Sequence, residues 1–330
     1  MKPAPFVHHA PRSVDEAVAA LVEAGHDGKV LAGGQSLIPI LNMRLASPGH
    51  LVDINRVTGL DTIEVTPDAV RVGALVRHAG LERSPEAYAA HPLLRQAVRN
   101  VAHPAIRNRG TTVGSIAHAD AAGEMPAILA LSDGVVEAAG PSGRREIRWS
   151  DFFLGALETS LHHDELAVAV RFGRFPAGTG TAFSESARRH GDYAMAGVAV
   201  AVTVTDGVVS RAQASFVSVT DVPTVLDLTE ALGGVEPGSG GWDAAADRAV
   251  EAVLAHVEPE GDIHVSADYR RMLVGELTRR TLPAAVRESD HSTPTPPSSA
   301  HFPTSNPTSS AHSPTPGVSE NEHSTEGGPS

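Results

Sequence analysis

The segment from Ile106 to Pro126 concentrates glycines, hydroxyl groups, a histidine and two carboxylates, and these residue types suit a phosphorylated ligand. Backbone amides and hydroxyls between Thr111 and Ser115 can donate hydrogen bonds to phosphate oxygens. The carboxylates of Asp120 and Glu124 can accept hydrogen bonds from sugar hydroxyls. The segment is therefore a candidate nucleotide site.

A second candidate is the run Ala32–Gly33–Gly34–Gln35–Ser36, which follows a predicted strand. Its two glycines permit positive φ and the close approach of a pyrophosphate. The run matches neither the Gly-x-Gly-x-x-Gly of Rossmann domains nor the Gly-Lys-Ser/Thr of P-loops, and alone it also fits an ordinary tight turn. Together, the two loops could hold the two phosphates of one dinucleotide.

Short strands and helices must position both loops. Ser13 and Glu16 form a capping box that predicts a helix, and the hydrophobic pattern predicts strands at 29–32 and 51–54 around the first loop. The pattern also predicts a strand at 69–74, a helix beginning at Pro92, and strands at 135–139, 146–149 and 165–172. These elements make an α+β region.

The chain divides into three predicted parts. The first, residues 1–176, contains both loops in subdomains of about 1–57 and 58–176, and a linker at 176–180 follows it. The second, residues 177–287, is a smaller α+β domain with an antiparallel sheet and helices on one face. Its predicted elements are strands at 194–205 and 212–220, a hairpin turn at Asp206–Gly207, and helices at 222–232, 243–257 and 265–283.

The third part, residues 288–330, is rich in Ser, Thr, Pro and His and contains no Lys or Arg. This composition predicts a disordered tail. An imperfect repeat at 298–304 and 309–315 contains histidines, so metal binding is an alternative interpretation of the tail.

The composition limits the class of protein. A formal charge of −13, without any cluster of Lys and Arg, argues against nucleic acid as a partner. No apolar run approaches the roughly 20 residues that span a bilayer, and the first residues lack the pattern of a secretory signal, so we expect a cytoplasmic protein without an integral membrane segment. Because the chain has no cysteine, any iron–sulfur cluster must lie on another chain.

Four motifs, taken together, resemble the FAD-binding medium subunit of the xanthine dehydrogenase and aerobic carbon monoxide dehydrogenase family. They are Ala32 to Pro39 with Leu51 to Ile54, Ile106 to Thr111 with Gly114 to Asp120, Ala187 to Ala194, and Tyr269 to Leu273. The resemblance covers residues 1–287. It implies a two-subdomain FAD-binding domain of the PCMH type, followed by the smaller C-terminal domain.

The resemblance also implies that FAD is the cofactor. The two loops would surround its pyrophosphate, Tyr193 would stack on the isoalloxazine ring, and Asp120 and Glu124 would lie near the ribityl chain or the ring. The implied cofactor-binding residues are Ala32, Gly33, Gly34, Gln35, Ser36, Thr111, Thr112, Val113, Gly114, Ser115, His118, Asp120, Glu124 and Tyr193. No catalytic side chain and no metal ligand is expected among them.

Finally, the resemblance implies an oxidoreductase built from several subunits. A large subunit with a molybdenum cofactor would oxidise the substrate, and a small iron–sulfur subunit would pass single electrons to the FAD of this chain. The FAD would then deliver them to an external acceptor. The expected assembly is a dimer of heterotrimers, and the chain alone is expected to be inactive on the physiological substrate.

Val113 departs from the family pattern, which usually has glycine at this position. Because a β-branched residue tolerates positive φ poorly, either Val113 has negative φ or the loop is reshaped. Two alternatives to the electron-transfer subunit stay open. One is a self-contained FAD-dependent oxidase of the same fold superfamily, and the other is a flavin-free assembly scaffold.

Overall fold

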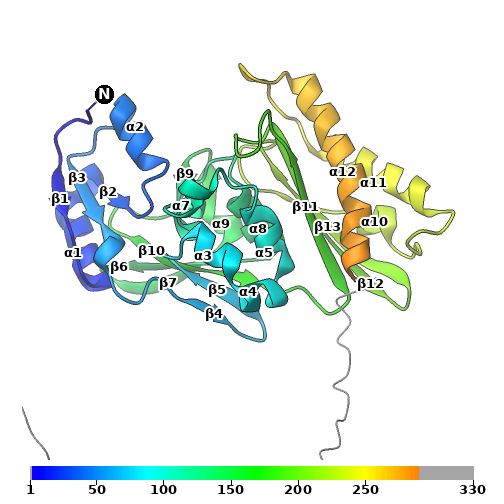
Figure 1. Cartoon of the computed structure of the whole chain (residues 1–330), viewed down its shortest axis with the longest axis horizontal. Helices are drawn as coiled ribbons and strands as arrows, with labels where there is room; N and C mark the ends of the chain where they lie inside the picture. Colours follow the sequence, from blue (N-terminus) through cyan, green and yellow to red (C-terminus); the bar gives the residue numbers. More distant parts are fainter. Residues whose placement is uncertain (1, 290–330) are drawn as a thin grey trace, which may run out of the picture. The chain divides into compact units, whose positions relative to one another are not determined.

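The computed structural model describes residues 2–289 and has an α+β fold (Figure 1). The chain begins with a three-stranded parallel sheet in the order β1–β3–β2. Its strands are β1 (Val7–His9), β2 (Gly28–Leu31) and β3 (His50–Asp53), accompanied by the helices α1 (Val14–Ala24) and α2 (Leu37–Met43). Ser13 caps α1 by accepting a hydrogen bond from the Glu16 amide at 3.1 Å, which confirms the predicted helix start.

A five-stranded antiparallel sheet follows, in the order β4–β5–β10–β6–β7. Its strands are β4 (Ile63–Val65), β5 (Ala69–Gly73), β6 (Val135–Gly140), β7 (Gly143–Arg148) and β10 (Leu166–Gly173). The connections contain the helices α3 (His78–Arg83), α4 (Pro85–Ala90), α5 (Pro92–Val98), α6 (Pro104–Arg107), α7 (Thr112–His118), α8 (Glu124–Leu131) and α9 (Trp149–Phe152), and the ribbon of β8 (Phe153–Gly155) and β9 (Glu158–Thr159). One continuous apolar core joins this sheet to most of these helices and to α1.

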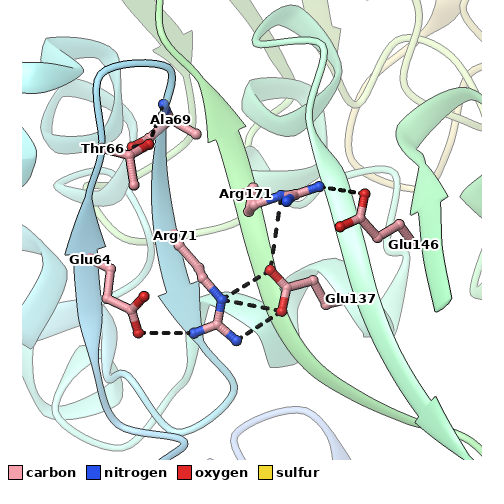
Figure 2. Close-up of polar contacts among 7 residues, drawn as sticks. All are labelled: Glu64, Thr66, Ala69, Arg71, Glu137, Glu146 and Arg171. Atoms are coloured by element: carbon pink, nitrogen blue, oxygen red, sulfur yellow. Dashed lines mark hydrogen bonds and ion pairs between the residues drawn. The ribbon is translucent and has the colours of Figure 1, made fainter. Parts of the chain in front are cut away.

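A row of charged side chains crosses this sheet, one from each strand (Figure 2). Arg71 on β5 lies directly opposite Arg171 on β10. Glu137 on β6 accepts three hydrogen bonds from Arg71, at 2.9 and 3.1 Å from Nε and 2.8 Å from Nη2, and lies 3.9 Å from Nε of Arg171. Glu64 and Glu146, on the two edge strands, pair with the same arginines. Glu137 therefore neutralises two adjacent positive charges.

The C-terminal domain is a four-stranded antiparallel sheet in the order β11–β12–β13–β14. The strands are β11 (Thr179–Ser186), β12 (Ala196–Thr205), β13 (Val208–Val217) and β14 (Val225–Asp227), and the helices are α10 (Thr229–Leu232), α11 (Trp242–His256) and α12 (Ala267–Ser289). The three helices lie on one side of the sheet (Figure 1), and their apolar side chains share a core with it. Asp206 and Gly207 form the predicted hairpin turn with φ of 52° and 82°.

The other side of this sheet contacts the first region of the chain. Helix α8 packs on β12 and β13, and α5 packs on β11. All eight residues of α8 are buried, which explains why its sequence shows no polar face. Helices of the first region thus cover part of this face of the four-stranded sheet.

Three predictions of local structure are wrong. The predicted helix at 222–232 is replaced by β14 and the short α10, because Val225–Asp227 pairs with the edge of β13 and the Asp227 carboxylate accepts a hydrogen bond from the Thr229 amide. The predicted linker at 176–180 already enters β11 at Thr179. The segment 106–126 is largely helical rather than a continuous loop. Of the predicted tail, Glu288 and Ser289 end α12, and the remainder, with its histidine repeat, lies outside the described residues.

Candidate functional site

The first glycine loop connects β2 to α2 and is fixed from the end of the neighbouring strand. Gly34 has a φ of +73°, a conformation that a β-carbon would strain. Asn55, in the 3₁₀ turn after β3, donates a hydrogen bond to the carbonyl of Ala32 at 2.8 Å and another to Asp53 at 2.6 Å. Gln35 braces the loop from within by donating to the carbonyl of Gly33 at 3.2 Å. The strand ends therefore hold the loop in one shape.

The two loops predicted from the sequence lie against each other. A β-carbon built on Gly33 would lie 2.4 Å from the carbonyl oxygen of Arg109 and 2.8 Å from the α-carbon of Gly110. Neither neighbour is a flexible side chain end, so only glycine fits at position 33. The backbone of residues 32–36 thus reaches the start of the 111–115 segment, as one dinucleotide site requires.

Two arginines lie beside these loops, Arg77 and Arg109, and neither was predicted as a cofactor-binding residue. Arg77 donates hydrogen bonds to the side-chain oxygen of Asn55, at 2.6 Å, and to the carbonyl of Arg109. Partial burial and the nearby positive charge of Arg109 lower the pKa of Arg77. Two guanidinium groups close together in this way favour an anion between or beside them.

The loops border a cavity of about 320 Å³. Its lining residues are Leu31, Ala32, Gly33, Gly34, Gln35, Ile38, Pro39, Asp53, Asn55 and Arg109. The lining combines backbone amides, one carboxylate and one exposed guanidinium. Arg109 could have been selected from the sequence, since it lies inside a recognised motif, but nothing in the sequence places Arg77 or Asn55 here.

The second loop begins a helix, which settles the conformation of Val113. Thr111 caps α7 by accepting a hydrogen bond from the Gly114 amide at 3.1 Å. Val113 lies in the first turn of α7 without positive φ, and its side chain is 2% exposed in the apolar core. The β-branched side chain therefore points away from the loop surface, and the first of the two expected outcomes is correct.

His78 contacts the backbone and a side chain of this second loop. Its backbone amide bonds to the carbonyl of Gly110 at 2.9 Å, and its Nδ1 lies 3.3 Å from the hydroxyl of Thr112. Burial, followed by the charge of Arg107, lowers the pKa of His78 to about 4. His78 is thus neutral at physiological pH, and the positive charge near the loops comes from the arginines.

The remaining predicted residues gather at the other end of α7. His118 is the last residue of this helix, and Asp120 turns the chain by accepting a hydrogen bond from the Ala122 amide at 2.9 Å. The Ser218 amide, at the end of β13, fixes this turn by donating to the carbonyl of Ala121 at 2.8 Å. A helix of seven residues is about 10 Å long, so it separates this group from Thr111 by about that distance.

The carboxyl group of Glu124 and the phenol of Tyr193 lie near the C-terminal end of α7. Glu124 starts α8 and is only 8% exposed, and burial together with the charges of Glu185 and Asp120 raises its pKa to about 8. Tyr193, between β11 and β12, is 69% exposed. Partial desolvation and the charges of Asp120 and Glu124 raise the pKa of its hydroxyl. Asp120, Glu124 and Tyr193 therefore lie near enough for their charges to interact, and they come from both regions of the chain.

Comparison with known proteins identifies the arrangement. Residues 4–174 match the model of the FAD binding domain in molybdopterin dehydrogenase, and residues 181–285 match that of the CO dehydrogenase flavoprotein C-terminal domain. The chain belongs to this family of flavoprotein medium subunits. It is therefore an oxidoreductase subunit with an FAD-binding domain, related to the medium chains of carbon monoxide dehydrogenases.

Several members of the family are similar over nearly their full length. The chain is 39% identical to the 6-hydroxypseudooxynicotine dehydrogenase complex subunit alpha of Paenarthrobacter nicotinovorans, over 91% of this chain and 100% of that protein. It is 38% identical to the carbon monoxide dehydrogenase medium chain of Hydrogenophaga pseudoflava, over 86% of this chain and 98% of that one. A solved structure of carbon monoxide dehydrogenase from the latter organism, lacking the Mo-pyranopterin moiety, superimposes with a TM-score of 0.81 over 87% of this chain and 99% of that chain.

Quinoline 2-oxidoreductase from Pseudomonas putida 86 is a further match, with 33% identity and a TM-score of 0.81 over 88% of this chain and 99% of that chain. Among residues 2–289, no helix is both long and apolar enough to cross a membrane. The same residues contain no group of three or more potential metal ligands.

Proposed function

We propose that this chain is the FAD-binding electron-transfer subunit of a heteromeric molybdenum hydroxylase. It accepts electrons from iron–sulfur clusters of a partner subunit and passes them to an external acceptor. The observation that carries this proposal is the contact of Gly33 with the backbone of Arg109 and Gly110, which makes one cradle of two loops that are separate in the sequence. FAD supplies the redox chemistry when bound, and the chain supplies orientation and electrostatics.

The cradle fits the diphosphate of FAD. In our proposal, residues 32–36 and 111–115 surround the pyrophosphate, and Arg77 and Arg109 balance its negative charge. His118, Asp120 and Glu124 lie toward the ribityl chain and the ring, and Tyr193 covers one face of the ring. The domain limits of the sequence analysis, 1–176 and 177–287, remain our proposed limits.

The proposed partner subunits are inferred from the absence of cysteine in this chain and from the relatives named above. With no cysteine, it cannot carry a conventional iron–sulfur cluster. We propose a large molybdenum-cofactor subunit and a small iron–sulfur subunit as partners, in a dimer of heterotrimers in the cytoplasm. The relatives named above act on compounds as different as carbon monoxide and quinoline, so the substrate is set outside this chain.

Purification of the chain with an FAD titration tests the proposal. We expect a yellow protein with acid-extractable FAD and no turnover by itself, and co-expression with its two partners should yield a complex containing molybdenum and iron. Covalent flavin with turnover would instead identify the self-contained oxidase. A protein that stays colourless at saturating FAD would identify the scaffold.

Gly33→Ala is the sharpest variant for this test. Because its β-carbon collides with the Arg109 carbonyl, the two loops must separate, and FAD affinity should fall at least about tenfold. Gly80→Ala in α3 is the matched control, since a β-carbon there meets nothing within 4 Å. Equal FAD affinity in the two variants would contradict the cradle.

A further inference from the structure

The side-chain amide of Asn55 uses all of its hydrogen-bonding groups within the chain. Its Nδ2 donates to the carboxylate of Asp53 at 2.6 Å and to the carbonyl of Ala32 at 2.8 Å. Its Oδ1 accepts a hydrogen bond from Nη2 of Arg77 at 2.6 Å. A flipped amide would point its oxygen at two acceptors and its nitrogen at a donor, so only this orientation satisfies the three partners. Asn55 therefore joins three separate segments of the chain.

Asp53 fixes the orientation of this amide. Its Oδ1 accepts hydrogen bonds from both the backbone amide of Asn55, at 3.0 Å, and the side-chain Nδ2. Burial acts to raise the pKa of Asp53, but the hydrogen bonds from Asn55 and the neighbouring His8 lower it overall. The carboxylate is thus ionised at neutral pH and can only accept hydrogen bonds. The side chain of Asn55 is therefore oriented by the protein itself.

Arg77 is attached to the second loop through both its backbone and its side chain. Residues 76–78 pair with residues 110–112 through a short antiparallel bridge. The Nη1 atom of Arg77 donates to the carbonyl of Arg109, while Nη2 of the same guanidinium donates to Asn55. Because the guanidinium is a rigid plane, the two hydrogen bonds fix the distance between Asn55 and the Arg109 carbonyl.

These contacts return to the first loop from which they start. The successive members are Ala32, Asn55, Arg77, Arg109 and Gly33. Gly33 follows Ala32 in the chain and lies directly against the carbonyl of Arg109, so the circuit has no free end. Asn55 and Arg77 belong to neither loop, and both are partly buried. Side chains outside the two loops therefore determine how far apart the loops lie.

We propose that Asn55 is a positioning residue for FAD, and that Asp53, Asn55 and Arg77 form a clamp that sets the spacing of the two loops. The proposal rests on the proposed FAD site between these loops. Since the polar groups of the Asn55 side chain are all engaged within the chain, Asn55 acts through the loops and not by a hydrogen bond to the cofactor. Arg77 contributes geometry in addition to its charge. Loops that already have the correct spacing need less ordering when FAD binds.

The first test uses the full chain without flavin and asks whether the clamp is one unit. Asn55→Ala and Arg77→Lys are made singly and together, and urea denaturation gives the free energy of unfolding of each variant. Arg77→Lys keeps the positive charge, but an ammonium group is not a rigid fork that holds two partners. We expect the double variant to lose less than the sum of the two single losses, because each substitution alone opens the circuit. Additive losses would overturn the clamp.

The matched control for this cycle is Asn100→Ala. The side chain of Asn100 also donates to a backbone carbonyl, that of Gln96, at 2.9 Å, but it lies outside both loops and the clamp. Its loss should add to that of Arg77→Lys. If Asn100→Ala were coupled to Arg77→Lys as strongly as Asn55→Ala is, the coupling would report general destabilisation and the clamp would be overturned.

The second test measures the Kd for FAD by flavin fluorescence, under conditions in which every variant is folded. Asn55→Ala and Arg77→Lys should each raise the Kd about tenfold, and the double variant should bind about as weakly as either one. Asn55→Asp, which keeps the acceptor for Arg77 but loses both donors, should bind no better than Asn55→Ala. Asn100→Ala should bind as wild type does.

Two results would overturn the positioning role. One is a wild-type Kd in Asn55→Ala or, should that variant not fold, in Arg77→Lys. The other is a double variant in which the two effects multiply, since independent effects would mean that Arg77 acts by its charge alone. A wild-type chain that takes up no FAD would overturn the proposed function and the positioning role with it, whereas the urea cycle decides separately whether the clamp exists.

Discussion

Arg109 is the side chain at the two loops whose contribution a single substitution can isolate. It is exposed, lines the cavity, and forms no ion pair through its guanidinium among the described residues. Its backbone carbonyl, not its side chain, holds Arg77, so Arg109→Gln keeps the loop contacts. We expect the Kd for FAD to rise about fivefold to tenfold, which corresponds to about 1 kcal/mol for one charge-assisted contact.

The salt dependence of FAD binding provides the control for this prediction. If Arg109 contacts the diphosphate, Arg109→Gln should also bind FAD with a weaker dependence on salt, because one exposed ionic contact is lost. Arg211→Gln, on β13 in the second domain, changes net charge equally and should leave both values unchanged. Equal losses in the two variants would mean that Arg109 acts only through the overall charge.

The types of residue in the sequence were sufficient to predict the two loops, but not the side chains that hold them in place. The glycines and hydroxyls of 32–36 and 111–115 are visible in the sequence, and the presence of two such segments in one chain is what favours a dinucleotide site over two ordinary turns. Asn55 and Arg77 are ordinary residues in ordinary contexts, and only the fold brings them to Ala32 and Arg109. Val113 departs from the family pattern without consequence for φ, because it lies inside α7, which begins at Thr112.

Among the elements, the five-stranded sheet depends on its charged row. Glu137→Gln leaves Arg71 and Arg171, opposite each other on neighbouring strands, without their shared carboxylate (Figure 2). Because Glu137 is 17% exposed and the contact with Arg71 is bidentate, we expect the free energy of unfolding to fall by about 1–2 kcal/mol. Urea denaturation measures this loss.

Glu64→Gln is the matched control for the row. Its side chain is 56% exposed and makes a single contact with Arg71 at 3.2 Å, so its removal should cost about 0.5 kcal/mol or less. If both variants lost the same free energy, the row would be a set of independent surface pairs.

Elements whose own pattern is strong were predicted from the sequence, and those made by tertiary contacts were not. Strands β2, β3, β5, β6, β10 and β12 and helices α1, α5, α11 and α12 match predicted segments to within a few residues, apart from the end of α12. Strand β11 has a weak pattern, since it contains glycine, serine and threonine, and it forms because β12 pairs with its whole length. Helix α8 was not predicted: its first three residues fall in the segment interpreted as a loop and the rest had no assignment, because burial on all sides removes the periodicity that identifies a surface helix.

For the whole molecule, the placement of α8 links the cofactor site to the second domain. Its first residue, Glu124, belongs to the proposed site, and its body packs on β12 and β13. At the other end of the contact, Gln96 of α5 donates a hydrogen bond to the carbonyl of Thr181 at 3.0 Å. Because Tyr193 of the proposed site comes from the second domain, we expect FAD binding to be lost when the two domains are separated.

The pH dependence of stability is also a property of the whole molecule, because buried carboxyl groups and buried histidines contribute to it with opposite signs. Burial raises the pKa of Glu124 to about 8 and that of Glu185 to about 7. From about pH 4.5 upward these two carboxyl groups bind more protons in the folded protein than in the unfolded chain, so their contribution to stability is lost as pH rises toward 8. Glu124→Gln is neutral at every pH, and its unfolding free energy relative to wild type should increase with pH across this window. A difference that stays constant would contradict the raised pKa.

On the acid side, two buried histidines have the opposite effect. Burial lowers the pKa of His78 and of His91 to about 4, against about 6.5 in the unfolded chain. Between these values the two histidines bind more protons in the unfolded chain, so their contribution to stability falls as pH falls, by up to about 1.4 kcal/mol per pH unit for each histidine and against the effect of the two carboxyl groups. His91 is fully buried, with Nε2 2.9 Å from the hydroxyl of Ser132 and far in sequence from both loops. The unfolding free energy of His91→Gln relative to wild type should therefore fall as pH rises from about 4 to 6.5, by up to about 1.4 kcal/mol per pH unit, while the variant still binds FAD at neutral pH. A difference that does not change with pH would show that His91 is not neutral in the folded protein.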